Sequence, residues 1–515
     1  MSANSFLAGL AAVFCLCSSA ANATEPNDRH LSRAALADKI QGGWAGQMIG
    51  VAYGAPTEFR SLGAINESEI SWAPDRVANA IDQDDLYVEM TFARVMDTVG
   101  LDATCGQYGE AFRDSKYSLW HANAAARRNL NRGIAAPSSG HPQYNAHAND
   151  IDFQIESDFI GLMCPGLPRE ANRFCDRVGR VMNYGDGLYG GMFVGGMYAA
   201  AFCEDDARKV VEAGLASLPP GSAYAALIRD LLAWSAQHPD DWRQVWQLLE
   251  AKWDRDDVCP DGALTPFNID AKLNGAYIAI GLLYGRRDFA RTIEIATRCG
   301  QDSDCNPSSA AGVLGVMLGY ARIPDPFKSG IPALADQKFR FTDYSFHSIC
   351  ASTFNRALAV IRQAGGRVTD TEVTLPRQSP EVPPLEQWDP GVPDRRIAAQ
   401  DPAWTWQAGW TNRKGAMTAS GPGAVATLRF TGTAIVLVGM LTQSGGRADV
   451  YLDGQLCPYL LDAFIVKNTN DNALWHVYAL APGEHLLRVV TRGDADPRSG
   501  GKQITIENAV VFRAR

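Results

Sequence analysis

The 515-residue sequence lacks the charge pattern and the apolar runs that mark several common protein classes. It has no run of basic residues, and 57 acidic against 47 basic side chains give a formal net charge of −10. This balance argues against nucleic acid or an anionic membrane surface as the main partner. Beyond the first two dozen residues, no segment approaches the ~20 apolar residues of a membrane span. We therefore expect no nucleic-acid partner and no membrane span; the sequence leaves the oligomeric state open.

Motifs of several enzyme classes are also missing. No Gly-x-Ser-x-Gly, P-loop or dinucleotide fingerprint stands between a predicted strand and a helix. The sequence has no Cys-x-x-Cys, and its eight histidines are scattered. Zinc sites are usually recognised by closely spaced Cys and His pairs, so the sequence predicts no zinc site.

The first residues have the pattern of a secretory signal peptide. Residues 6–17 form a short apolar run, followed by the small-x-small sequence Ala21-Asn22-Ala23 and then by polar residues. We predict a signal peptide at residues 1–23, and hence a periplasmic or extracellular protein. Nine of the eleven cysteines follow this segment. Because nine is odd, at least one thiol has no partner within the chain.

Two domains with different hydrophobic periods are expected after the signal peptide. Residues 30–366 carry helical periodicity almost throughout, beginning with Leu36, Ile40, Trp44 and Met48. Glycines recur in this first helix, which indicates burial against close neighbours. Proline is frequent in residues 367–400, as expected of a stiff linker.

Residues 401–515 change to a period of two and predict a small all-β domain, a sandwich or jelly roll. The fold class is therefore multidomain, a large all-α domain followed by a small all-β domain. The predicted strands are residues 424–430, 434–440, 448–452, 476–479, 485–490 and 504–511. Trp404, Trp406, Trp410 and Trp475 either stack on sugars or belong to the core of this domain, which is possible as a carbohydrate-binding module.

Two acidic clusters stand where helices of the large domain should begin. The first is Gln83-Asp84-Asp85, and the second is Asp302-Ser303-Asp304-Cys305. Four carboxylates supply the oxygen ligands that Mg²⁺, Mn²⁺ or Ca²⁺ prefers. We expect the two clusters to form one site for one or two such ions. Glu58 follows the first helix on a loop, and we expect it to be a general acid or base above that site.

Further polar residues are candidates for contacting a substrate. Residues 149–158 alternate acidic and apolar side chains, which favours a strand or an extended segment. Asp150, Asp152 and Glu156 in this segment, Asp186 between two glycines, and Asn306 beside the second acidic cluster are the candidates. The alternative for the first three is a solvent-facing strand, and for Asp186 a simple turn.

These motifs occur in an order that resembles the ADP-ribosylglycohydrolase family, an all-α fold with a two-magnesium site. The resemblance covers residues 34–325 and includes the glycine-rich first helix leading to Glu58. Gln83-Asp84-Asp85 corresponds to the family's Thr-Asp-Asp, and Asp302-Ser303-Asp304-Cys305 to its Asp-x-Asp-Thr. The resemblance implies Mg²⁺ (or Mn²⁺) bound by Asp84, Asp85, Asp302 and Asp304, with Gln83 and Cys305 at the flanking positions. It also implies catalytic roles for Glu58 and Asp85.

The sequence departs from the family pattern at three positions. Val51 stands where the family has an aspartate, and Gln83 and Cys305 replace the hydroxyl-bearing threonines. A thiol is a poor magnesium ligand, so one metal position is expected to be altered or empty.

Two main functions are consistent with these sequence features. The first is an exported, divalent-metal-dependent hydrolase of a glycosidic bond, acting on an ADP-ribosyl or other furanosyl or glycan substrate. The alternative is a non-catalytic, exported carbohydrate-binding protein with a degenerate metal site; a sandwich that only packs on the helical domain is a third possibility.

Overall fold

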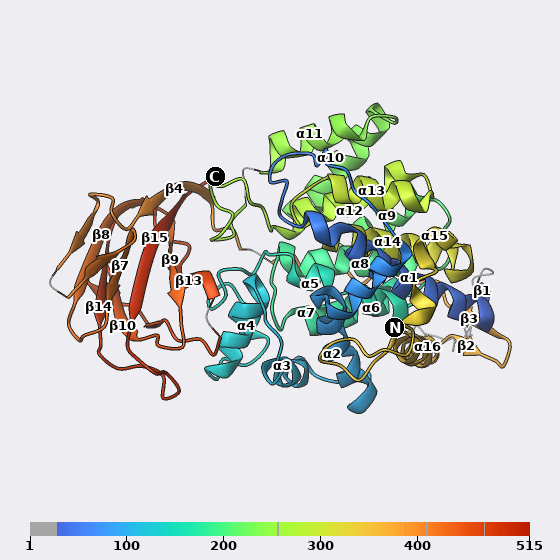
Figure 1. Cartoon of the computed structure of the whole chain (residues 1–515), viewed down its shortest axis with the longest axis horizontal. Helices are drawn as coiled ribbons and strands as arrows, with labels where there is room; N and C mark the ends of the chain where they lie inside the picture. The colour runs from blue at the N-terminus through green and yellow to red at the C-terminus, as the bar shows by residue number, and fades with distance from the viewer. Residues whose placement is uncertain (1–27, 255–256, 387, 408, 468) are drawn as a thin grey trace, which may run out of the picture.

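The computed structural model describes residues 28–515 apart from residues 255–256, 387, 408 and 468. The predicted signal peptide lies outside the described residues. A large helical body and a sheet-rich region lie side by side, with α4 and β13 near the boundary between them (Figure 1). The helices are α1 Arg33–Gly54, α2 Asp84–Thr98, α3 Cys105–Arg113, α4 His121–Asn131, α5 Asp152–Ile155, α6 Asp158–Met163, α7 Pro168–Gly179, α8 Asp186–Ala201, α9 Ala207–Ala216, α10 Ala223–Gln237, α11 Trp242–Trp253, α12 Ala271–Gly285, α13 Phe289–Arg298, α14 Cys305–Leu318, α15 Asp325–Lys328 and α16 Phe346–Gln363. Short 3₁₀ turns are η1 Ala55–Thr57, η2 Pro74–Asp82, η3 Ser138–Gly140, η5 Tyr320–Arg322 and η6 Ile331–Ala333.

Helices α1 and α14 form a backbone-to-backbone contact at the centre of the helical domain. Ser32 caps α1 as its sequence predicts, because its side chain accepts a hydrogen bond from the amide of Ala35 at 3.0 Å. Glycines along one face of α1 allow the close approach: a Cβ added at Gly46 would lie 2.2 Å from the carbonyl oxygen of Ala311, and one at Gly50 would lie 2.1 Å from that of Pro307. The expected burial of this helix is confirmed. The contact fixes the start of α14.

One segment of the helical domain differs from its predicted structure. The strand or extended segment expected at residues 149–158 is wrong, since residues 152–155 form the short helix α5 and α6 begins at Asp158. Its acidic and apolar residues are both buried, for example Asp152 and Phe153, so the alternation did not mark a solvent-facing side. The last helix begins at Phe346 after a Ser345 cap.

The chain from residue 367 onwards contains only strands among the described regular elements. Two of them, together with the start of the chain, form a three-stranded sheet in the order β1-β3-β2, and the others form two six-stranded antiparallel sheets. One has the order β11-β10-β14-β8-β5 with β12 beside β10, and the other the order β13-β9-β15-β7-β6 with β4 beside β15. The strands are β1 Arg29–Ser32, β2 Arg367–Val368, β3 Glu372–Leu375, β4 Val392–Ala398, β5 Trp404–Trp406, β6 Thr411–Arg413, β7 Ala416–Ala419, β8 Val425–Gly432, β9 Ala434–Leu441, β10 Arg447–Leu452, β11 Gln455–Leu456, β12 Leu461–Asp462, β13 Thr469–Val477, β14 Gly483–Thr491 and β15 Ile504–Arg513. Residues 367–400, expected to be a linker, thus include β2, β3 and β4.

The two large sheets share one apolar core, which confirms the all-β sandwich. Leu428 of β8 and Leu487 of β14 pack with Leu437 of β9 and Val511 of β15. Trp404, Trp410 and Trp475 are buried in the same core, and Trp406 stacks on Trp404 with ring centroids 4.7 Å apart. The core interpretation of the three buried tryptophans is therefore confirmed.

Strand β9 is apolar on both faces because it belongs to two cores. Ile435 and Leu437 point into the sandwich, whereas Val436 and Val438 pack against the helical domain. On the helical side the partners are Ala146, Val258 and Ala263. The sandwich is thus joined to the helical domain by an apolar contact. None of the helices in the described part of the chain is long and apolar enough to cross a membrane.

Candidate metal centre and cleft

The two acidic clusters converge at the N-terminal ends of α2 and α14. Asp84 and Asp85 open α2, and Asp304 precedes the first residue of α14, Cys305. One donor atom each from Asp85, Asp304 and Cys305 lies within 4.8 Å of the other two, and the same holds for Glu58, Asp302 and Asp304. Asp304 therefore links two groups of candidate ligands. Both groups border a cavity of about 980 Å³.

The carboxylates of this centre are held in an environment that disfavours their charge. Burial, followed by the charge of Asp304, raises the pKa of Asp85 and of Asp302 well above the usual range. The same two causes raise the pKa of Asp84 to about 6. Such crowding of buried acids destabilises the folded protein unless a cation neutralises their charge.

Several carboxylate oxygens of the centre have no protein partner. Asp85 Oδ1, Asp302 Oδ1 and Asp304 Oδ1 are buried and accept no hydrogen bond from any described residue. Buried polar atoms normally have a partner, so these three oxygens fit a site for a bound cation. The donor set is rich in oxygen, which fits a hard divalent cation such as Mg²⁺ or Mn²⁺.

Glu58 lies beside this centre on the loop after η1. The loop is tied to the second acidic cluster by two contacts: the amide of Phe59 donates to the carbonyl of Gln301 at 3.0 Å, and the hydroxyls of Thr57 and Ser303 are 2.8 Å apart. The Glu58 side chain remains accessible from the cavity that it lines. Desolvation by the cavity walls, followed by the charges of Asp304 and Asp84, raises its pKa to about 8.

The two residues that replace the family's threonines differ in what they do. Gln83 lines the cavity, but its side-chain nitrogen donates to Asn79 Oδ1 at 2.7 Å. The Cys305 thiol lies between the clusters and donates to Asp85 Oδ2 at 3.4 Å. Burial, and then the neighbouring carboxylates, raise the pKa of this thiol well above its usual range. Cys305 is therefore a protonated hydrogen-bond donor in this structure.

Of the five candidate substrate contacts, Asp152 borders the cavity. Its two carboxylate oxygens accept from the amides of Ala122 and Asn123 at 3.1 and 3.0 Å, so it caps the start of α4. Asp150, Glu156 and Asn306 are buried and Asp186 is half-buried, and none of the four is among the described residues that line the cavity. They are engaged elsewhere: Asp150 with His147, Glu156 with Asn123, Asp186 with the amide of Tyr224, and Asn306 with Asn274.

Sequence reasoning missed two parts of the cavity wall. The first is a set of rings, in which Phe267 lies 5.1 Å from Phe59 and 5.8 Å from His121 between ring centroids. The second comes from the sandwich, whose residues 462–467 and Arg498 complete the wall opposite the helices. No local motif marks either part, because the rings come from three distant segments and the second wall depends on how the domains pack.

Comparison with known proteins agrees with the helical fold of the large domain. The family model described as ADP-ribosylglycohydrolase matches residues 32–350, well over half of the chain. The chain therefore belongs to the ADP-ribosylglycohydrolase family, whose members are glycosidic hydrolases that generally depend on metal ions. No curated protein matches the sequence.

Several solved structures are similar to parts of the chain. One, titled "ADP-ribosylglycohydrolase-related protein complex", is 16% identical with a TM-score of 0.39, and the match covers 63% of this chain and 99% of that one. A xanthan lyase from Paenibacillus is 13% identical with a TM-score of 0.19, over 28% of this chain and 15% of that one. A family two carbohydrate esterase from Cellvibrio japonicus is 19% identical with a TM-score of 0.17, over 23% and 32% respectively. These scores are too low to support an inference about substrate.

Proposed function

We propose that this protein is an exported hydrolase that cleaves a glycosidic bond with the help of a divalent metal ion, Mg²⁺ or Mn²⁺. We propose an ADP-ribosyl or another furanosyl or glycan compound as its substrate. The observation that carries the proposal is the convergence of Glu58 with Asp302 and Asp304 within 4.8 Å, at the edge of the cavity. Export rests on the signal-peptide pattern of residues 1–23.

Asp84, Asp85, Asp302 and Asp304 are the residues that would hold one or two ions. When bound, such an ion supplies Lewis acidity toward sugar hydroxyls and water. Asp85 is 1% exposed, and its Oδ2 already accepts from the Cys305 thiol. We therefore assign Asp85 to ion binding and place the proton transfer on another residue.

Glu58 is the residue we propose for that proton transfer. Its carboxylate reaches the cavity, and a raised pKa brings it near the pH at which a general acid or base is most effective. The Thr57–Ser303 and Phe59–Gln301 contacts hold its loop against the acidic cluster. Glu58 would thus take a proton from the attacking water, or give one to the leaving oxygen or nitrogen. The aromatic rings of Phe59 and Phe267 flank it on the cavity wall and provide a surface for the sugar or base.

The test is hydrolysis by the purified chain from residue 24 onwards. We would assay ADP-ribosylated peptides and aryl furanosides with Mg²⁺, with Mn²⁺ and with a chelator. We expect metal-dependent release of the sugar, and its loss in Asp302→Asn. Asp336→Asn is a matched control, because this carboxylate is exposed and pairs only with His347 on the surface. Activity that persists in Asp302→Asn, or that the chelator does not reduce, would contradict the proposal.

The second candidate function is binding without catalysis, which the Cys305 thiol favours because it stands in place of a ligand oxygen. Calorimetry with the same ions and with a glycan panel separates the two. Glycan binding that needs no metal, together with no metal uptake at the acidic centre, would support the binding protein and exclude the hydrolase.

A further inference from the structure

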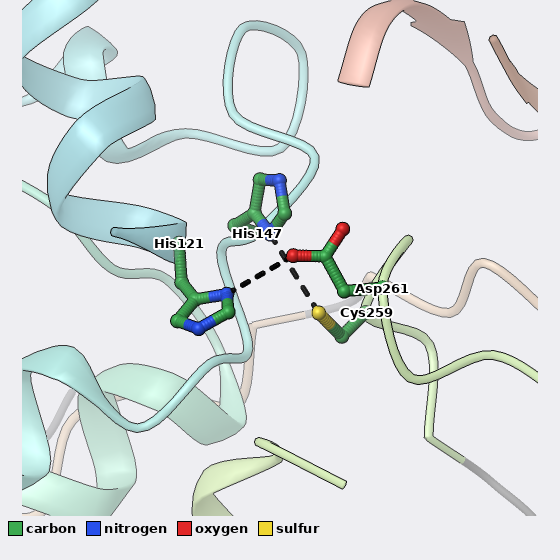
Figure 2. A group of neighbouring side chains, drawn as sticks. All are labelled: His121, His147, Cys259 and Asp261. Atoms are coloured by element: carbon green, nitrogen blue, oxygen red, sulfur yellow. Dashed lines mark hydrogen bonds and ion pairs between the residues drawn. The ribbon is translucent and has the colours of Figure 1, made fainter. Parts of the chain in front are cut away.

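Four side chains of a different chemical type gather at the wall of the cavity, which two of them, His121 and Asp261, help to line. His121 opens α4, His147 lies on the loop before α5, and Cys259 and Asp261 lie on the loop before α12. Figure 2 shows the four side chains directed toward one another from these separate segments. One ligand atom from each lies within 4.8 Å of all the others. No part of the function proposed above uses them.

Two of the six separations among these atoms are those expected of a tetrahedral zinc site, and the others lie within 4.8 Å. His121 Nδ1 lies 3.3 Å from Asp261 Oδ2, and His147 Nδ1 lies 3.7 Å from Cys259 Sγ. Zinc bonds of about 2.0–2.1 Å to nitrogen or oxygen and 2.3 Å to sulfur place two nitrogen or oxygen ligands about 3.3 Å apart, and a nitrogen–sulfur pair about 3.6 Å apart. We propose that His121, His147, Cys259 and Asp261 bind one Zn²⁺ ion.

The donor set selects zinc over the ions suited to the acidic centre. Two imidazole nitrogens, one thiolate and one carboxylate are borderline or soft ligands, whereas Mg²⁺ prefers oxygen. With neutral imidazoles, the charges of the thiolate and of the carboxylate cancel those of the ion. A neutral cluster costs less to bury than a charged one. The chain thus presents two metal centres of different selectivity.

A catalytic use of Cys259 fits the geometry less well. In a nucleophile–base–carboxylate triad, the histidine uses one ring nitrogen for the nucleophile and the other for the carboxylate. Here both Cys259 Sγ and Asp150 Oδ2 approach the same atom, Nδ1 of His147, at 3.7 and 2.8 Å. The thiol is also 1% exposed, out of reach of a substrate in the cavity.

Asp150 contacts two of the proposed ligands. Its Oδ2 accepts from His147 Nδ1 and, at 3.2 Å, from the Cys259 thiol. Zinc binding displaces the protons from these two atoms. Asp150 Oδ2 then loses both donors and would instead face the positive charge of the ion, outside its four ligands. The prediction of Asp150 as a substrate contact is replaced by this role within the proposal.

The position of the cluster indicates a structural function. Arg396 of β4 contacts the loop with Cys259 and Asp261. Its guanidinium donates to the carbonyls of Pro260 and Ala263 at 2.8 Å each. His476 of β13 contacts the loop with His147, since its Nε2 lies 2.7 Å from the carbonyl oxygen of Pro142. An ion bound by four protein ligands has no open position, as in structural zinc sites. Zinc would therefore tie together the segments on which the sandwich rests.

The sequence predicted no zinc site, because closely spaced Cys and His pairs are the usual mark of one. The ligands come from three segments far apart in the chain, so no Cys or His pair has the short spacing that marks zinc motifs. Folding alone brings them together.

Cobalt substitution tests the site without an activity measurement. The full chain is stripped of metal, given excess Mg²⁺ to fill the acidic centre, and titrated with Co²⁺, which gives a thiolate-to-metal charge-transfer band when cysteine is a ligand. We expect one Co²⁺ per chain and a band that disappears in Cys259→Ser. Cys305→Ser is the matched control, since this second buried thiol also lies beside carboxylates; its band should persist. No band, or a band that disappears with Cys305→Ser, would overturn the proposal.

A second variant covers the case in which Cys259→Ser does not fold. The His121 side chain is 17% exposed, so His121→Gln disturbs packing less. We expect it to weaken zinc binding about tenfold or more against a competing chelator, with an unchanged circular dichroism spectrum. In the unmodified protein, zinc should raise the unfolding temperature. An unfolding temperature that does not respond to zinc, or equal affinity in His121→Gln, would refute the site.

Discussion

The thiol of Cys305 donates a hydrogen bond to Asp85 Oδ2 at 3.4 Å and so joins the first turn of α14 to the first turn of α2. The raised pKa of the thiol, caused mainly by burial, keeps its proton in place at neutral pH. A weak donor therefore holds Asp85 in position. An oxygen at residue 305 would be a better ligand for a magnesium ion than this sulfur.

Restoring a hydroxyl at this position should strengthen the metal centre. We expect Cys305→Thr to bind Mg²⁺ several-fold more tightly, because the threonine oxygen can bind the ion or donate to Asp85. Calorimetric titration with Mg²⁺ measures this directly. Cys305→Ala is the control: it leaves Asp85 Oδ2 without its donor and should lower the free energy of unfolding by about 1–3 kcal/mol in the metal-free protein. Equal Mg²⁺ affinity in the threonine variant would show that residue 305 is not near the ion.

The parts of this molecule that were predicted from sequence are those encoded locally. The pair of acidic helix starts, the loop with Glu58 and the period-two strands each occupy one short stretch, so their pattern survives without knowledge of the fold. The strands predicted at residues 424–430 and 434–440, for example, correspond to β8 and β9. The carboxylates at both helix starts predicted one shared ion site, and the family resemblance implied the same arrangement.

The parts that were missed depend on packing between distant segments. Glu156 was expected to face a substrate, but burial of residues 149–158 turned it toward Asn123 of α4. Asp152 borders the cavity, but its carboxylate caps the start of α4. Phe464 and Arg498 line the cavity only because the sandwich packs on the helical domain. Val436 carries that contact, and its apolar side chain could not be told from an ordinary core residue of β9.

Replacement of Glu58 by Gln distinguishes a proton-transfer role from ion binding. As a general acid or base, Glu58 should leave Mg²⁺ affinity nearly unchanged when replaced, while kcat falls by about 10²–10⁴-fold. The measurement is steady-state kinetics beside a Mg²⁺ titration. A large loss of Mg²⁺ affinity at unchanged kcat under saturating metal would instead make Glu58 a ligand, as its place beside Asp302 and Asp304 allows.

The contact between α1 and α14 should tolerate no side chain at Gly50. A Cβ there would lie 2.1 Å from the carbonyl oxygen of Pro307, and backbone cannot move aside cheaply. We expect Gly50→Ala to destabilise the protein by about 1–3 kcal/mol or more, and to weaken Mg²⁺ binding because α14 carries Asp304 at its start. Chemical denaturation measures the first effect and calorimetry the second.

Gly106→Ala is the matched control for this prediction. Gly106 lies within α3, and the nearest atom to an added Cβ is Thr104 Oγ1 at 3.8 Å. This variant should be neutral or more stable by about 0.5–1 kcal/mol, because alanine restricts the unfolded chain. If both variants behaved alike, the close helix contact would not be the cause.

The contact between the domains should weaken in acid because of His476. Burial lowers the pKa of this imidazole to about 4, and its Nε2 lies 2.7 Å from the carbonyl oxygen of Pro142. In the unfolded chain the pKa returns to about 6.5, so between these values the unfolded state binds more protons. Stability due to His476 is therefore complete above about pH 6.5 and is lost as the pH falls toward 4, by up to about 1.4 kcal/mol per pH unit.

The carboxylates with raised pKa values contribute the opposite slope to the pH dependence of stability, so the informative quantity is the difference in unfolding free energy between variant and parent. We expect His476→Gln to remove this acid-dependent part from denaturation curves recorded between pH 4 and pH 7, whereas His347→Gln, on the exposed surface, should keep it. Parallel curves for the parent and His476→Gln would show that the imidazole is not buried at the domain contact.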